Sequence, residues 1–187
     1  MKNRVRTRSV AATTLALTVV GTLTAGVSYA TADTSVTATA TAHKPVTRSA
    51  DGWKAQQQAA NVKLAGEYFQ AIQKGDFDKV GRILDKNVVW HQPGFNQFSG
   101  THKGRDAVFK MLGGMTEASQ GTFAINKVNG LMPNGDKVAA PIHFSGKRGD
   151  RSMSMDGVDV LRFKHGKVVE VWLYSGDQAA EDAFWGR

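Results

Sequence analysis

The chain has 187 residues, 41% of them hydrophobic and 21% charged, which fits one globular domain with additional segments. Its formal charge is +8, but Lys and Arg are spread along the sequence, which argues against the dense basic patch of a nucleic-acid-binding protein. The chain contains no cysteine, which excludes disulfides and a lipid anchor attached through cysteine. A packed core must therefore provide the stability.

Residues 1–32 show the pattern of a secretory signal peptide. Basic residues, an apolar segment and a small-residue cleavage site follow one another: Lys2, Arg4, Arg6 and Arg8, then Val10 to Val27, then Ser28-Tyr29-Ala30 or Ala30-Thr31-Ala32. The alternative is an uncleaved anchor, although five threonines between positions 13 and 24 make the segment weakly apolar for a permanent span. We expect export, cleavage that leaves a net charge of +4, and no stable membrane association afterwards.

Residues 33–52 are rich in Thr, Ala and Ser and lack apolar periodicity, so we expect a flexible linker before a folded domain over residues 53–187. The domain begins with a helical stripe formed by Leu64, Tyr68 and Ile72, and Gly75 is placed to end this helix. Asp76 then follows as the N-cap of a short second helix.

Strands dominate the rest of the chain. A short strand over 87–91 and the turn Pro93-Gly94 precede a loop over 95–100 and a third helix after Gly104. Four further strands and a closing helix are predicted at 122–128, 137–145, 151–163, 167–174 and after Asp177. Helices followed by a run of antiparallel strands indicate an α+β fold with the helices on one face of the sheet.

The segment 155–172 contains an acid inside an apolar strand. His165-Gly166 forms a tight turn, and strand alternation puts Asp159 and Leu161 on the face opposite Val160. If the face of Asp159 points toward the helices, burial raises its pKa and lets it act as a general acid or base. The alternative is a structural polar cluster in which Asp159 pairs with His91, His143 or an arginine.

Five segments together resemble the SnoaL-like polyketide cyclase family of the NTF2-like, ketosteroid-isomerase-like superfamily, over about residues 58–185. They are Glu67-Tyr68-Phe69, Gly75-Asp76-Phe77, Val88-Val89-Trp90-His91-Gln92-Pro93-Gly94, Gly100-Thr101-His102-Lys103-Gly104-Arg105 and Gly166-Lys167-Val168-Val169-Glu170-Val171-Trp172. The resemblance implies a cone, in which a strongly curved antiparallel sheet wraps around N-terminal helices and an internal pocket. It also implies a homodimer through the outer sheet face and an acid/base role at the position of Asp159. It leaves the activity open, because this fold carries many functions.

Two histidines are candidates to assist Asp159. His91 ends the first strand near the expected pocket mouth and could relay protons; the alternative is a partly exposed histidine hydrogen-bonded to the loop. His143 would form a proton-transfer pair with Asp159 if it points inward and would belong to the dimer face if it points outward.

We expect aromatic residues to line the ligand pocket, together with Leu161, which shares a strand face with Asp159. Trp90, Trp172 and Tyr174 are wall candidates, and Phe95 and Phe98 are candidates for a loop lid. The alternative for Trp90 and Trp172 is that they fill the core.

The sequence has neither a metal-binding motif nor a phosphate loop, so we expect no metal and no cofactor. The expected partner is a small, largely apolar or cyclic molecule, on which Asp159 would catalyse isomerisation or aldol-type cyclisation. The alternatives are a non-catalytic ligand-binding domain and a protein-interaction module.

Overall fold

The computed structural model describes residues 50–187; the predicted signal peptide and most of the predicted linker lie outside them. The elements are α1 (Ala50–Gln73), α2 (Phe77–Ile83), β1 (Leu84–Gln92), β2 (Gly100–Lys103), α3 (Arg105–Ala118), β3 (Ala124–Val128), β4 (Met132–Asn134), β5 (Lys137–Arg148), β6 (Arg151–Lys164), β7 (Lys167–Ser175) and α4 (Gln178–Trp185). None of the helices within the described residues has the length and apolar character needed to cross a membrane.

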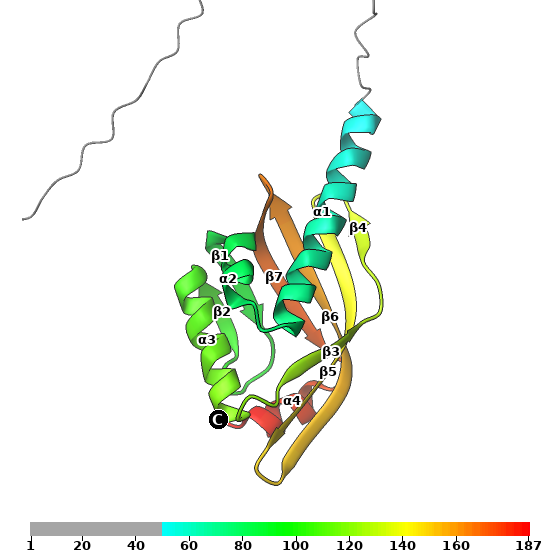
Figure 1. Cartoon of the computed structure of the whole chain (residues 1–187). Coiled ribbons are helices and arrows are strands. Elements are labelled where there is room, and N and C mark those ends of the chain that lie inside the picture. The colour runs from blue at the N-terminus through cyan, green and yellow to red at the C-terminus, as the bar shows by residue number, and fades with distance from the viewer. Residues whose placement is uncertain (1–49) are drawn as a thin grey trace, which may run out of the picture. The chain divides into compact units, whose positions relative to one another are not determined.

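The strands form one sheet in the order β2-β1-β7-β6-β5-β3, with β4 also paired to β5. The helices α1, α2 and α3 lie over one face of this sheet, and α4 lies at the end where β5 and β6 bend (Figure 1). The predicted α+β architecture, with helices on one face, is confirmed.

One strand pair differs from the antiparallel sheet that the sequence predicts. β1 pairs with β7 in parallel, whereas every other described pair is antiparallel. Turn patterns set the direction only of strands that a short turn connects. The sequence between β1 and β7 contains most of the domain, so no turn signal could reveal this parallel pair.

Local sequence signals account for most element boundaries. Asp76 and Asp177 cap α2 and α4, because their carboxylates accept hydrogen bonds from the backbone N–H groups of Lys79 and Ala180, both at 2.9 Å. The two residues between β6 and β7, His165 and Gly166, have φ values of 51° and 70°, as a two-residue hairpin turn requires.

Two short strands depart from the predicted elements. β2 and β4 were not predicted, because strands this short show no clear alternation. Gly113 and Gly114 lie inside α3 and do not interrupt it. A Cβ at Gly114 would come within 2.9 Å of the Phe98 ring, so this helix position requires a residue without a side chain.

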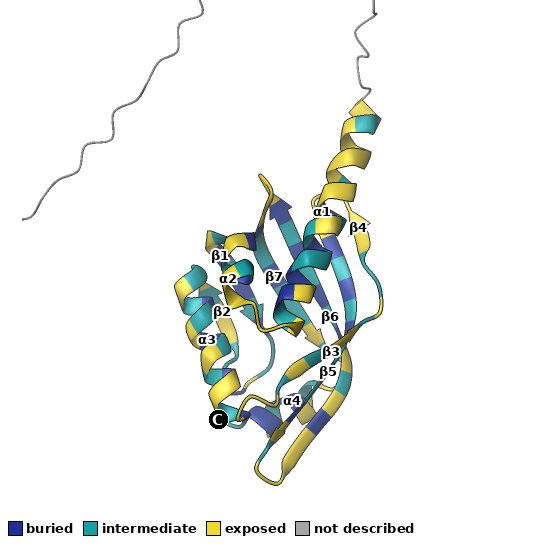
Figure 2. Cartoon of the chain, in the orientation of Figure 1, coloured by how far each residue is buried: buried dark blue, intermediate teal, exposed yellow. Residues whose placement is uncertain are grey.

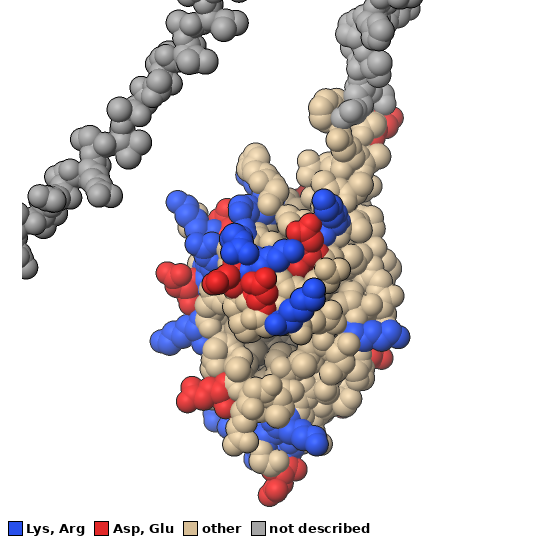
Figure 3. All heavy atoms as spheres, in the orientation of Figure 1, with Lys and Arg blue, Asp and Glu red and all other residues tan. Residues whose placement is uncertain are grey.

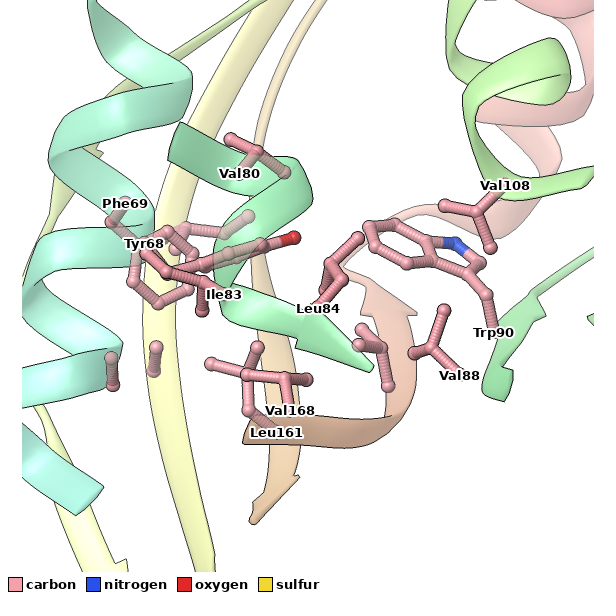
Figure 4. Packing of buried hydrophobic residues seen from close by; sticks show 14 of the residues in the cluster. Tyr68, Phe69, Val80, Ile83, Leu84, Val88, Trp90, Val108, Leu161 and Val168 are labelled. Carbon is pink, nitrogen blue, oxygen red and sulfur yellow. The ribbon is translucent and has the colours of Figure 1, made fainter. Parts of the chain in front are cut away.

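The core lies between the helices and the inner face of the sheet, where buried residues alternate with less buried ones along β5 and β6 (Figure 2). Residues of α1, α2 and β1 meet those of β6 and β7 there: Tyr68, Phe69, Val80, Ile83, Leu84, Val88, Trp90, Leu161 and Val168 (Figure 4). The predicted alternation in β6 is confirmed, since Asp159 and Leu161 are 3% and 0% exposed while Val160 is half-buried. Asp159 therefore points into the fold.

Candidate functional site

A cavity of about 340 Å³ lies between the inner sheet face and the helices α1, α3 and α4. Its buried wall combines apolar and polar side chains: Tyr68, Trp90, Gln92, Met115, Ile142, Phe144, Asp159 and Glu181. This volume is at the lower end of the range for small-molecule sites.

The mouth of the cavity lies between the α1–α2 turn, the end of α3 and the start of β3. Apart from Tyr174 on β7, the exposed lining residues are found there: Gln73, Gly75, Phe77, Thr116, Gly121 and Ala124. The surface between α3 and β3 is hollowed and its centre carries no charged side chain, whereas charges of both signs gather over α2 (Figure 3). The entrance is therefore uncharged, with Gln73 and Thr116 as its polar residues.

Asp159 provides the central ionisable group of the cavity wall. Its side chain is 3% exposed, and no hydrogen bond to its carboxyl is found within the described residues. Burial, and then the charge of Glu181, raise the pKa of Asp159 from 3.8 to about 7. A carboxyl with this pKa can take up or release a proton near neutral pH, as a general base requires.

Tyr68 supplies a hydroxyl from the opposite wall. The side chain extends from α1 across the interior of the fold (Figure 4), and its hydroxyl is buried without a hydrogen-bond partner in the described part of the chain. Burial, and then the charge of Asp159, raise the pKa of Tyr68 well above its ordinary value. Tyr68 therefore stays protonated and can donate a hydrogen bond to a ligand.

Glu181, on α4, is a second buried acid that the sequence analysis missed. Its carboxylate accepts hydrogen bonds from Gln92 and Trp185 at one oxygen and from Ser175 and Gln178 at the other. Burial still raises its pKa, although the bonds from Ser175 and Trp185 oppose this. Helical spacing gives a signal that could have found it, because Glu181 shares a helix face with the buried Trp185.

His91 lies on the outer face of the sheet. Its neighbours in β1, Trp90 and Gln92, point into the cavity, so alternation turns His91 outward. Nε2 of His91 lies 2.8 Å from Oε1 of Glu170, and its ring stacks on Trp172 at 5.5 Å. The structure does not bring His91 together with Asp159.

His143 also lies on the outer face, opposite Asp156 rather than Asp159 in the strand register. Its Nδ1 is 2.8 Å from the Asp156 carboxylate, and its Nε2 is 3.0 Å from the Ser154 hydroxyl. Of the two orientations left open by the sequence, the structure has the outward one. No proton-transfer pair between His143 and Asp159 is formed.

The structure also places the remaining predicted pocket residues. Trp90 lines the cavity, and Tyr174 borders it although its side chain is 58% exposed. Leu161 packs in the core beside the cavity, and Trp172 lies on the outer face with His91.

The two candidate lid residues do not line the cavity. Phe95 is 82% exposed, and Phe98 packs edge-on against Trp185 at 5.2 Å. Their loop lies against α4, where the Asp182 carboxylate accepts a hydrogen bond from the Phe95 N–H at 3.0 Å. This loop therefore supports α4, and the mouth opens elsewhere.

A family model described as "SnoaL-like domain" matches residues 65–171, more than half of the chain. The chain belongs to the SnoaL-like family. The resemblance that the motifs between Glu67 and Trp172 indicate is thereby confirmed. Among curated proteins, none matches this SnoaL-like chain.

Solved structures share the fold of this SnoaL-like domain. A protein of unknown function with a cystatin-like fold from Xanthomonas campestris is 50% identical, with a TM-score of 0.67 over 68% of this chain and 98% of that one. Bal32a, from a soil-derived mobile gene cassette, is 27% identical, with a TM-score of 0.67 over 70% and 99%. An NTF2-like protein from Burkholderia xenovorans is 20% identical, with a TM-score of 0.59 over 69% and 98%, and shows the fold alone.

Family membership establishes the NTF2-like fold of the domain, but the fold does not define its chemistry. In the SnoaL-like domain, within residues 50–187, no three His, Asp or Glu side chains come together as metal ligands would. The groups at hand for chemistry in the cavity are the carboxyls of Asp159 and Glu181 and the hydroxyl of Tyr68.

Proposed function

We propose that this SnoaL-like protein binds a small, largely apolar molecule in its cavity and that Asp159 exchanges a proton with it. One observation carries the proposal: two residues that line the same cavity carry polar groups for which the described part of the chain supplies no hydrogen-bond partner, the Asp159 carboxyl and the buried Tyr68 hydroxyl. Leaving buried polar groups unpaired is costly, and a ligand that pairs with them removes this cost.

The arrangement suits proton abstraction next to a carbonyl group. The Tyr68 hydroxyl donates a hydrogen bond to the ligand's carbonyl oxygen, and the ionised Asp159 takes a proton from the adjacent carbon. The electron pair of the broken C–H bond moves to the oxygen, where the hydrogen bond from Tyr68 stabilises the enolate. In an isomerisation, Asp159 returns the proton to another carbon conjugated with the enolate. In an aldol cyclisation, the enolate carbon attacks a second carbonyl of the same molecule, and the oxygen of that carbonyl takes the proton from Asp159.

Deuterium exchange into 2-tetralone, a cyclic ketone, tests this activity with the full chain. We expect the protein to accelerate exchange at the carbons beside the carbonyl, with a rate that rises through about pH 7 as Asp159 ionises. Asp159→Asn should lower the rate at least tenfold, because the base is lost, and Tyr68→Phe should lower it less, because only a hydrogen bond is lost. Mass spectrometry of the ketone measures the exchange.

The matched control is Asp156→Asn, which removes an acid from the outer face of the same strand and should leave the exchange rate unchanged. An undiminished rate in Asp159→Asn would assign the proton transfer to another group.

Non-catalytic ligand binding is the second candidate function. The outward placement of His91 and His143 favours it, because neither imidazole can serve as a proton relay for Asp159. In that case the wild-type protein binds 2-tetralone without accelerating exchange.

We further propose that residues 1–32 direct export and are then removed. The mature protein, which consists of the linker and the domain, is then located outside the cell. The basic, apolar and small-residue segments of this sequence support the proposal. Mass spectrometry of the protein from the culture medium, with a mature N-terminus near residue 31 or 33, tests it.

The outer sheet face is proposed as the interface of a homodimer. Half-buried apolar side chains align across its strands, with Ala139, Val160 and Trp172 in one row and Pro141 beside Val158 in the next. Val160→Asp should convert the dimer to a monomer, because it puts an unpaired charge in the centre of the face. Light scattering after size-exclusion chromatography measures the mass.

The control for the dimer is Lys110→Asp on the exposed side of α3, which should leave the mass unchanged. A wild-type protein that runs as a monomer at micromolar concentration would contradict the dimer.

A further inference from the structure

In the part of the chain that the structure describes, the ionisable side chains that line the cavity include acids but no bases. Among the described lining residues, Asp159 and Glu181 are acidic, and none is Lys, Arg or His. The arginines near α4 are held outside, since Arg148 and Arg151 donate to the backbone carbonyls of Phe184 and Ala183 at 3.2 and 3.0 Å. The low-dielectric walls therefore enclose a negative potential that no basic lining residue offsets.

The two acids differ in how their oxygens are occupied. Glu181 accepts hydrogen bonds at both oxygens, from Gln92, Trp185, Ser175 and Gln178, whereas both oxygens of Asp159 lack a donor within the described residues. Of the two carboxyls, Asp159 is therefore the one whose oxygens remain free to accept hydrogen bonds from a ligand.

Within residues 50–187, no other element places a positive group where it lowers the pKa of Asp159. Tyr68 faces it from α1 and stays neutral, because burial and then the charge of Asp159 raise the pKa of Tyr68, while the charge of Glu181 on α4 raises the pKa of Asp159. Its strand neighbours are Ala140 on β5 and Leu173 on β7, which are uncharged.

From these contacts we infer that the ligand carries a basic nitrogen, bound as an ammonium against Asp159, with its hydrocarbon part between the aromatic walls. The inference deepens the ligand-binding part of the proposed function and rests on the cavity being a ligand site. While an ammonium is paired with Asp159, this carboxylate does not take a proton from carbon. Ammonium N–H groups would pair with the open oxygens of Asp159, and Trp90, Phe123 and Phe144 line the cavity with aromatic rings, whose faces attract cations. An anionic ligand would be repelled by both carboxyls.

The charge pairing predicts a pH dependence of binding. An ammonium ligand binds the ionised form of Asp159, whose fraction rises from about a tenth at about pH 6 to about nine tenths at about pH 8 if its pKa is about 7. The affinity for the amine should therefore rise about tenfold across this range, because the ionised form becomes about tenfold more abundant. A neutral ligand that accepts a hydrogen bond gains nothing from this ionisation.

Isothermal titration calorimetry on the full chain tests the inference with three compounds that share the indane ring system and differ only in their polar group. They are 1-aminoindane, 1-indanol and indane-1-carboxylate. At about pH 8 we expect the amine to bind at least tenfold more tightly than the alcohol, and the carboxylate to bind more weakly than both. Asp159→Asn should abolish the preference for the amine while the alcohol still binds, and Asp156→Asn on the outer face should retain the preference.

Other outcomes contradict the inference. Binding of the alcohol as tightly as the amine, or tighter binding of the carboxylate, overturns the basic nitrogen and leaves the ligand site intact. Failure of all three compounds to bind, at concentrations that saturate ordinary small-molecule sites, overturns both the inference and the proposed cavity function.

Discussion

Asp159→Asn is expected to raise the free energy of unfolding by about 4 kcal/mol at about pH 8, but to change it little at about pH 4. The physical reason is the rise in the pKa of Asp159 from 3.8 to about 7, which burial and Glu181 cause. Between these two pKa values the folded state binds more protons than the unfolded state, so the wild-type protein loses stability as pH rises. The amide of Asn stays neutral and avoids this loss.

Urea unfolding of the wild type and of Asp159→Asn across this pH range measures the difference in the free energy of unfolding. Equal slopes of this free energy against urea concentration would confirm that the two proteins expose the same surface when they unfold. Asp156→Asn is the control, because Asp156 is exposed and pairs with His143 on the outer face. A gain in stability that is the same at both ends of the range, or a loss at about pH 8, would contradict the buried, unpartnered state of Asp159.

Trp185→Ala is expected to lower the free energy of unfolding by about 3–5 kcal/mol. Trp185 is 0% exposed, and its ring packs edge-on against Phe98, Phe123 and Phe184. Its Nε1 also donates a hydrogen bond to Glu181 at 3.3 Å, so the same change removes one of the two donors to that oxygen of the second buried acid. Truncation therefore leaves a large void at the base of α4 and loosens one wall of the cavity.

Thermal and urea unfolding measure this loss, with Trp53→Ala as the matched control. Trp53 is 60% exposed near the start of α1, and its truncation should change the stability by no more than about 0.5 kcal/mol. Equal effects of the two truncations would contradict the role of Trp185 as the anchor of α4.

The sequence correctly predicts that Asp159 shares one face of β6 with Leu161, because the strand alternates over its whole length, but it leaves open whether that face points inward. In the structure, the apolar residues beside it, Leu161 and Phe163, identify the buried face. The same limit applies to His91 and His143, because alternation shows which residues share a face and not which face is inside. Trp90 and His91 are adjacent and either could have pointed inward, so only tertiary packing decides between them.

The mouth of the cavity was beyond what local patterns could predict, and helical spacing could show only that Glu181 shares a helix face with Trp185, not that this face borders a cavity. The mouth is formed where α3, β3 and the α1–α2 turn come together, and these segments are distant in sequence. Glu181 reads as an ordinary acid in the first turn of a capped helix, and it becomes a cavity residue only because α4 packs under the sheet. Phe95 and Phe98 were predicted to form a lid over the pocket, but their loop packs against α4 instead.

The most direct test is an NMR titration of the Asp159 side-chain carboxyl carbon in the ligand-free protein, assigned as the resonance missing from Asp159→Asn. Because Glu181 lies close enough to couple, the variant spectrum also separates the two acids. A midpoint of about 7 is predicted and would establish a proton-exchanging carboxyl inside the cavity. A midpoint near the ordinary value of 3.8 would show that Asp159 is solvated or paired, and would contradict its proposed role.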